Sequence, residues 1–327
     1  MEQQPGPVNW APHNPEPHPG MVRFWTWEAF AHGAEAVCYF RWRQAPMAQE
    51  QMHAGMLRPD GVAAPAFHEA KQVAGELRDA GNVENVSAPV AIVFDYDADA
   101  AWQVQPHGED LSYFGLVFGL YRAMRSLGLS IDIIPPTTRD FAGYRLVAVP
   151  GMMHVPDDLM QALVKSDSEV LFGPRTGARD CDMRIPIPLP PNIPNLDVTV
   201  SRVESLRPDM AIDLEGCGQI EGYREVLEGT ASMGLVTRTG STVSMSDGKL
   251  SYVGAWLDLD GWKRVIELAC ERTGLDIIQL PNAVRVRETG AEQFWFNHDD
   301  VEHVVNGKTL APLSVTRQEK PISEREA

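Results

Sequence analysis

The stretch from Pro89 to Phe94, PVAIVF, decides how most of this chain folds. An unbroken apolar run that is rich in β-branched residues is typical of a strand buried on both faces. After it, apolar strands alternate with amphipathic helices. The pattern predicts helices at 111–127, 156–165 and 260–273, and strands at 130–134, 145–149, 169–172, 197–205 and 250–256. This alternation predicts an α/β domain, a doubly wound parallel sheet, from 83 to 281.

The segment before this domain has a different texture. Six prolines keep 5–20 out of helix and sheet, so we expect an ordered loop there. Helices are predicted at 21–32 and 65–80, with a buried strand at 34–42 between them. The order of loop, helix, strand, loop and helix is that of the closing part of a (β/α)8 barrel. Residues 1–82 are far fewer than the ~250 of such a barrel, so we expect only a partial barrel remnant.

The chain ends in a short β tail. Two strand-like stretches are predicted at 284–287 and 293–297, and a charged segment follows at 318–327. The tail is too short for a stable domain of ordinary size. We therefore expect three parts: the barrel remnant (1–82), the doubly wound domain (83–281) and a small C-terminal β domain with a charged tail (282–327).

Composition excludes several classes of function. The 327 residues include 28 Lys and Arg against 45 Asp and Glu, and the net charge of −17 argues against a nucleic-acid partner. No apolar run is long enough to cross a membrane, so we expect a soluble protein with no membrane partner. The four cysteines lie far apart without a CxxC pair, which argues against zinc and favours reduced thiols in the cytoplasm. No cofactor is expected.

Three separated blocks carry a specific resemblance. They are MEQQPGPVNW at 1–10, FRWRQ at 40–44 and QEQMHAG at 49–55. In their order and spacing they closely resemble the bacterial β-galactosidases of glycoside hydrolase family 42. The resemblance implies a barrel remnant, then a flavodoxin-like trimerisation domain similar to class I glutamine amidotransferases, then a small β domain. It also implies a β-galactoside substrate and a homotrimer, or a complementing barrel fragment as partner.

By this resemblance Glu2 takes the place of the catalytic nucleophile. A retaining glycosidase needs one ionised carboxylate to attack the anomeric carbon and a second carboxyl, ~5–5.5 Å away, to protonate the leaving oxygen. The alternative is that a glutamate beside a start methionine is a solvated residue of a frayed end. The sequence block around Glu2 favours the nucleophile.

The resemblance also assigns five substrate-binding residues. Trp10, Phe40 and Trp42 match aromatic side chains that face the sugar, and core packing is the alternative for each. Glu50 and His53 match residues that bind the sugar hydroxyls, and a surface ion pair is the alternative. Their Glu-x-x-His spacing also occurs in di-iron bundles, but those need two such motifs and two further glutamates.

No residue matches the family's general acid/base glutamate. Glu28 and Glu35 are the nearest unassigned carboxylates, but the first falls in a helix and the second near the start of a strand, at the wrong end of a barrel for catalysis. Two hypotheses follow. The chain is the nucleophile-bearing portion of a retaining β-galactosidase, or it is a non-catalytic oligomerisation module or split-gene fragment that needs a complementing chain.

An amidotransferase function for the second domain is disfavoured. The class I enzymes carry a nucleophilic cysteine on a sharp turn after a strand. The matching turn here, 173–177, follows the strand at 169–172 and reads GPRTG, without cysteine. Cys181 comes too late, and His154 has no matched partner. The domain therefore has assembly as its expected role.

Overall fold

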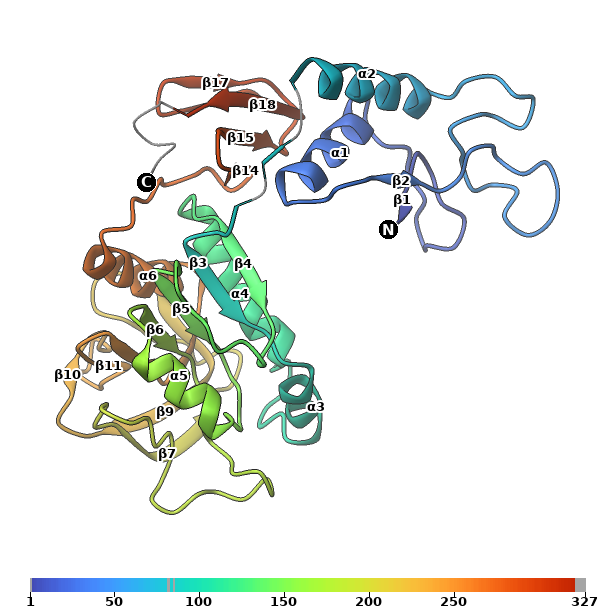
Figure 1. Ribbon diagram of the computed structural model, residues 1–327. Coiled ribbons are helices and arrows are strands. Elements are labelled where there is room, and N and C mark those ends of the chain that lie inside the picture. The colour runs from blue at the N-terminus through green and yellow to red at the C-terminus, as the bar shows by residue number, and fades with distance from the viewer. Residues whose placement is uncertain (1, 81–82, 85, 321–327) are drawn as a thin grey trace. The chain divides into compact units, whose positions relative to one another are not determined.

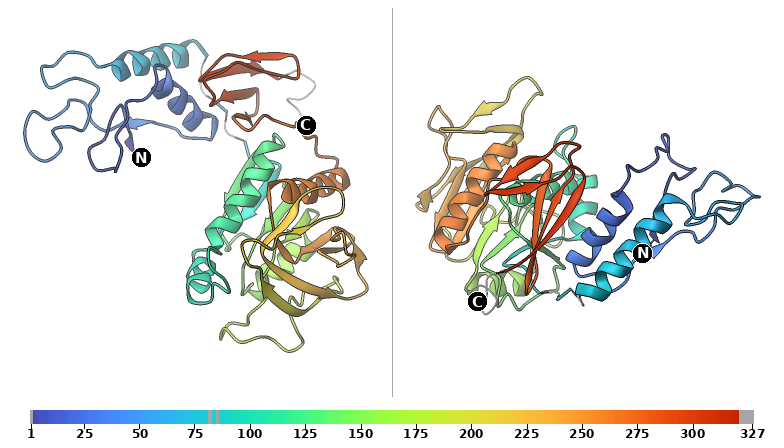
Figure 2. Two further views of the ribbon diagram at one scale, coloured as in Figure 1. Left: turned by 180° about the vertical axis from the view of Figure 1, so that it is seen from behind. Right: turned by 90° about the horizontal axis from the view of Figure 1, so that it is seen from above.

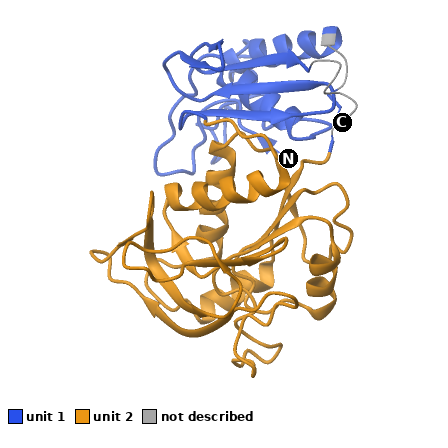
Figure 3. Cartoon of the chain, turned by 90° about the vertical axis from the view of Figure 1, so that its left-hand side faces the viewer, with its two compact units in different colours: residues 1–86, 280–327 blue, residues 87–279 orange. Residues whose placement is uncertain are grey.

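The chain forms two compact units in the computed structural model, which describes residues 2–80, 83–84 and 86–320. Unit 1 combines residues 1–86 with 280–327, and unit 2 comprises 87–279 (Figure 3). Unit 1 is thus built from both ends of the sequence, with unit 2 inserted between them.

Unit 2 contains a seven-stranded sheet, a second smaller sheet and four helices among its described residues. Its elements are β3 (Val90–Val93), α3 (Tyr96–Val104), α4 (Tyr113–Ser126), β4 (Ile131–Ile134), β5 (Leu146–Val149), α5 (Asp157–Lys165), β6 (Glu169–Phe172), β7 (Thr199–Ser205), β8 (Ile212–Asp213), β9 (Gln219–Glu228), β10 (Ser232–Met233), β11 (Ser244–Asp247), β12 (Leu250–Val253), β13 (Ala255–Leu257) and α6 (Leu259–Thr273).

The large sheet has the order β10-β11-β12-β6-β5-β3-β4. Its five strands from β12 to β4 are parallel, and β10 and β11 add an antiparallel edge. All residues of β3, β5 and β6 are buried, as the apolar runs predict for a sheet covered on both faces. In Figures 1 and 2, α4 and α6 pack together on one face while α5 covers the other.

Capping side chains determine where α4 and α6 begin. The Ser112 hydroxyl accepts from the Gly115 N–H at 3.1 Å, and the Asp258 carboxylate accepts from the Gly261 N–H at 2.8 Å. Side-chain oxygens at these positions satisfy backbone donors that have no partner within the helix. The sequence predicted that the last helix starts at Asp260. The helix starts one residue earlier, at Leu259, because Asp258 is its cap and Asp260 lies within the first turn.

The smaller sheet of unit 2 runs β13-β9-β7, with β8 also paired to β9. The sequence predicted a single sheet in this domain, whereas unit 2 contains this second sheet as well. The strand predicted at 250–256 is divided at Gly254, so β12 belongs to the large sheet and β13 to the small one. A Cβ at Gly254 would lie 2.8 Å from the Leu227 side chain, which explains the glycine at this crossing.

Unit 1 begins with two strand–helix pairs and ends in short strands. Its elements are β1 (Glu2–Gln3), α1 (Met21–Ala31), β2 (Cys38–Tyr39), α2 (Pro65–Ala80), β14 (Val284–Glu288), β15 (Glu292–Asn297), β16 (His303–Val305), β17 (Lys308–Leu310) and β18 (Ser314–Glu319). β1 and β2 are parallel, whereas β14-β15-β18 form an antiparallel sheet and β16-β17 a hairpin. The strand predicted at 34–42 is only two residues long, because β1 pairs with it over two residues.

The C-terminal sheet shares a hydrophobic core with α1. Phe24 and Trp27 of α1 are fully buried with Phe294 and Phe296 of β15, and the Phe24 and Phe296 rings meet edge to face with centroids 5.3 Å apart. Each part alone would expose these rings to water. The division into compact units therefore differs from the three parts predicted, because the tail joins the N-terminal segment.

Candidate functional site

Two parallel strands hold the first of the candidate residues. Glu2 lies opposite Cys38 and Gln3 opposite Tyr39, and the Phe40 N–H extends the pairing by donating to the Gln3 carbonyl oxygen at 3.1 Å. Each strand is followed by a helix, α1 or α2 (Figure 1). Glu2 and Phe40 are thereby carried on neighbouring strands.

The loops that follow β1 and β2 are joined to each other. The Ala54 N–H donates to the Pro7 carbonyl oxygen at 2.9 Å, and the Asn9 amide donates to the Gln49 carbonyl oxygen at 3.0 Å. These bonds join residues 40 and 47 positions apart in the sequence. They bring the first and third blocks of the predicted site into one surface.

Glycine is needed at position 55, where the loop after β2 folds back against the backbone of residues 43–44. A Cβ at this position would lie 2.5 Å from the Gln44 backbone nitrogen and 2.7 Å from the Arg43 carbonyl carbon. The next residue, Met56, donates its N–H to the Arg41 carbonyl oxygen at 2.8 Å. Any larger residue than glycine would push the returning loop away from the backbone of Arg43 and Gln44.

His53 lies at the centre of the candidate site and is only 2% exposed. Its Nε2 is 2.7 Å from Gln4 Oε1, and its ring meets the Phe40 ring edge to face with centroids 5.2 Å apart. Burial is the largest cause that lowers the pKa of His53 below 6.5, and the Arg41 charge lowers it further, whereas Glu2 raises it. The imidazole is therefore held in its neutral form near pH 7.

Glu50 and His53 lie in one turn rather than in a helix. The His53 N–H donates to the Glu50 carbonyl oxygen at 3.1 Å, and the exposed Glu50 carboxylate forms an ion pair with Arg41. The Arg41 guanidinium also lies over the Phe40 ring, 4.8 Å from its centroid. Sequence reasoning did not assign Arg41 a role. Its place between Phe40 and Trp42 in the FRWRQ block was the available signal.

The two tryptophans of the candidate site are open to solvent. Trp10 is 72% exposed and Trp42 is 64% exposed. The Trp42 ring contacts Phe67 edge to face with centroids 5.9 Å apart. Neither indole is packed into a core formed by the described residues. Phe40 is half-buried between Arg41 and His53.

Comparison with known families accounts for most of the chain. Residues 1–80 match the β-galactosidase family Glyco_hydro_42, and residues 88–276, more than half of the chain, match the β-galactosidase trimerisation domain. The chain belongs to glycoside hydrolase family 42. The family match covers both the segment that carries the candidate site and the core of unit 2.

Known family 42 proteins resemble this chain over nearly its whole length. A β-galactosidase of Thermus thermophilus is 45% identical over 303 residues, which are 91% of this chain and 47% of the relative. β-Galactosidase Bga of Halorubrum lacusprofundi is 33% identical over 91% of this chain and 47% of its own. The crystal structure of a β-galactosidase from psychrophilic Marinomonas ef1 superimposes with a TM-score of 0.93 at 38% identity, over 98% of this chain and 52% of that one.

This family 42 chain spans about half the length of the curated relatives it matches. The matched half is a C-terminal portion of those relatives. The fold prediction of a partial barrel followed by a trimerisation domain agrees with these neighbours.

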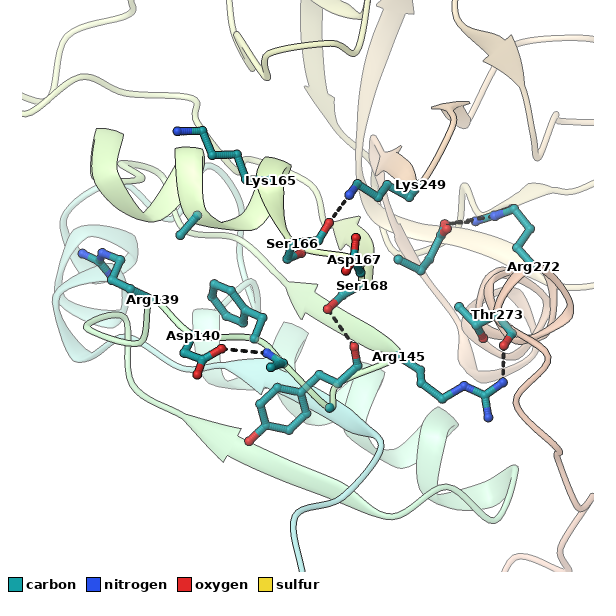
Figure 4. Close-up of a pocket in the computed structure, with 16 residues that line it drawn as sticks. Arg139, Asp140, Arg145, Lys165, Ser166, Asp167, Ser168, Lys249, Arg272 and Thr273 are labelled. Atoms are coloured by element: carbon teal, nitrogen blue, oxygen red, sulfur yellow. Dashed lines mark hydrogen bonds and ion pairs between the residues drawn. The ribbon is translucent and has the colours of Figure 1, made fainter. Parts of the chain in front are cut away.

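A cavity of about 810 Å³ lies in unit 2, at the amino ends of β5, β6 and β12 (Figure 4). Five cations line it, namely Arg139, Arg145, Lys165, Lys249 and Arg272. Four of them form ion pairs or hydrogen bonds with other residues of the chain. Arg272 pairs with Glu169, Lys249 and Arg145 donate to backbone carbonyls, and Arg139 pairs with Asp158 at 2.8 Å. Carboxylates thus pair with two of the five cations, Arg139 and Arg272.

The turn after β6 carries an arginine at its left-handed position. Arg175 has a φ of 66° and is 3% exposed. Its guanidinium donates to the carbonyl oxygens of Gln105 and Pro106 and lies over the Trp102 ring, 4.2 Å from the centroid. Cys181 lies further along the chain and is exposed. The turn thus anchors a neighbouring loop and presents no nucleophile.

Other classes of site find no support in the part of the chain that the structure describes. Among these residues, no three His, Cys, Asp or Glu side chains gather closely enough to hold a metal ion. None of the helices described is both long and apolar enough to cross a membrane. The four cysteines are free thiols.

The charge of Glu2 makes a testable contribution to His53. Because this carboxylate raises the pKa of His53, Glu2→Gln should lower that pKa further. A folded-state pKa below 6.5 means that the neutral ring favours the fold above about pH 6.5, and that this contribution is lost as pH falls toward the lowered value. NMR titration of the chain with 15N-labelled histidine measures the shift, with Glu35→Gln as the control that should leave it unchanged.

Proposed function

We propose that this chain is the nucleophile-bearing portion of a retaining β-galactosidase. One observation carries the proposal: Glu2 lies on β1 two residues before Gln4, whose side-chain oxygen is 2.7 Å from Nε2 of the buried His53, within the residues that match the β-galactosidase family. Glu2 attacks the anomeric carbon of a terminal β-galactosyl group and forms a galactosyl ester, which water then hydrolyses. The substrate class is that of the relatives, which are β-galactosidases.

The remaining candidate residues bind the sugar. Trp10, Trp42 and Phe40 present aromatic faces to the apolar C–H side of a galactose ring. Glu50 and His53 exchange hydrogen bonds with its hydroxyls, which rejects epimers by leaving buried groups unpaired. Arg41 Nε and His53 Nδ1 are buried without a hydrogen-bond partner in the described residues, and a ligand rich in hydroxyl groups suits such a cluster.

The proton donor comes from outside the residues described here. Glu28 is in α1 and Glu35 precedes β2, so neither lies on a strand as Glu2 does. We propose that the general acid/base glutamate belongs to further barrel strands on another segment or chain. Without it, the reaction loses most of the ~10²–10⁴-fold that general acid catalysis supplies.

Unit 2 is proposed as the assembly domain. Its parallel strands, numbered in sequence, have the order 2-1-3-4-5 from β4 to β12, which is the flavodoxin-like order. The matched trimerisation domain supports a homotrimer. A non-catalytic oligomerisation module is the second candidate function, favoured by the extent of this domain. The free thiols suit a reducing cytoplasmic location.

Complementation tests the proposal. The chain alone should release little nitrophenol from a nitrophenyl β-galactoside. Mixing it with a polypeptide that carries the preceding barrel strands and their glutamate should give hydrolysis, and sedimentation should report three copies of this chain in the active species. An inactive trimer would favour the second candidate function instead.

A further inference from the structure

We propose that Arg41 is a positioning residue of the candidate site, which holds the Glu50 carboxylate and the Phe40 ring where a bound galactosyl group meets them. The inference rests on the proposed function and adds to it a residue that does not itself take part in the chemistry. Arg41 lies two residues after the end of β2. The preceding Phe40 donates its N–H to the Gln3 carbonyl oxygen, and the Arg41 carbonyl oxygen accepts from the Met56 N–H at 2.8 Å, so hydrogen bonds on both sides hold its backbone.

Arg41 connects three of the candidate residues. Its guanidinium forms the ion pair with Glu50 and lies over the Phe40 ring, which in turn contacts His53. Its side chain is 20% exposed, whereas that of Glu50 is 49% exposed. The more buried partner is fixed by the strand and the ring, and the more exposed carboxylate lies in a loop. Arg41 therefore restrains the side chain of Glu50, rather than the reverse.

The carboxylate needs such a restraint because of where it lies. The turn from Glu50 to His53 has a single described backbone hydrogen bond across it, and the side chain of Glu50 reaches into solvent. A free glutamate side chain would lose rotamer freedom on binding a hydroxyl. An ion pair formed before the sugar arrives removes that cost from the binding step.

Arginine suits this position better than lysine does. A planar guanidinium can stack on the Phe40 ring with its face while its edge donates to a carboxylate. Lysine keeps the charge but has no flat face. The Arg41 charge lowers the pKa of His53 and the Glu2 charge raises it, so removing Arg41 leaves the effect of Glu2 without this opposing charge.

The first test needs no catalytic activity. In the full chain, Arg41→Met should raise the pKa of His53 toward 6.5, and Arg41→Lys should largely restore the lowered value. NMR titration of 15N-labelled histidine reports both, with His53→Gln to assign the signal. A pKa of His53 that is the same in both variants as in the parent chain would refute the electrostatic part of the inference.

The second test uses the complemented assembly and a double-mutant cycle. Arg41→Met should lower kcat/KM for the nitrophenyl galactoside by roughly 10-fold, mainly through KM, and Arg41→Lys should lower it less. If Arg41 acts through Glu50, most of the loss should disappear in a Glu50→Gln background. If Arg41→Met lowers kcat/KM by the same factor with Glu50 present as in the Glu50→Gln background, the inference is overturned. If the assembly is inactive even with the parent chain, the proposed function is refuted instead. The effect of Arg41 on the pKa of His53 is then tested by the titration alone.

Discussion

Glu2→Gln is expected to abolish galactoside hydrolysis by the complemented chain. The amide has nearly the shape of the carboxylate but cannot attack the anomeric carbon, so no galactosyl ester forms. We expect kcat to fall by about 10⁴-fold or more, as for removal of a catalytic nucleophile. Initial rates of nitrophenol release measure the loss, at a pH where the parent assembly is most active.

The matched control for this variant is Glu35→Gln. Glu35 is an exposed glutamate of unit 1 that precedes β2, and we assign it no part in the reaction. Its replacement makes the same chemical change and should leave kcat within about twofold of the parent value. Equal losses in the two variants, or full activity of Glu2→Gln, would remove Glu2 from the mechanism.

The second large effect is expected on the stability of unit 2. Trp102 is 1% exposed, and its indole N–H donates to the Gly151 carbonyl oxygen at 2.7 Å while its face supports Arg175. Trp102→Ala opens a cavity and leaves this carbonyl without its donor. We expect a loss of about 3–5 kcal/mol in the free energy of unfolding of unit 2. Urea unfolding, followed by hydrogen exchange of peptides from β5, measures the loss.

Trp10→Ala provides the comparison for this loss. It removes the same indole from a position that is 72% exposed. The unfolding free energy of unit 2 should change by no more than about 0.5 kcal/mol. If the two variants destabilise β5 equally, then the buried Trp102 does not contribute through packing.

Sequence patterns predicted the helices and strands whose bounds are determined by their own residues. The helix predicted at 65–80 and the strand at 169–172 have the observed bounds, since each has a clear period and a clear end. By contrast, α3 was not predicted, although Asp95 caps its start by accepting from the Asp97 N–H. The hairpin of β16 and β17 was also missed, although Asn306 and Gly307, both with positive φ, are the expected residues of its two-residue turn.

Long-range contacts set the limit on predicting the site. The named residues Glu2, Phe40, Glu50 and His53 do gather in one region, because the resemblance supplied them together. The partners that arrange them were not predicted. Arg41 acts on Glu50 through an ion pair that no local periodicity encodes. Whether these residues bind galactose remains a prediction.

The core shared by Phe24 and Phe296 implies an order of events during biosynthesis. Its two halves are separated by the whole of unit 2, so the N-terminal helices emerge from the ribosome long before the strands that cover them. Unit 2 is contiguous and can fold as soon as it has been translated. Once folded, it holds residues 87 and 279 at fixed positions, and the entropic cost of closing so long a loop falls. The nascent N-terminal segment therefore cannot bury its aromatic side chains until the strands after unit 2 have been translated.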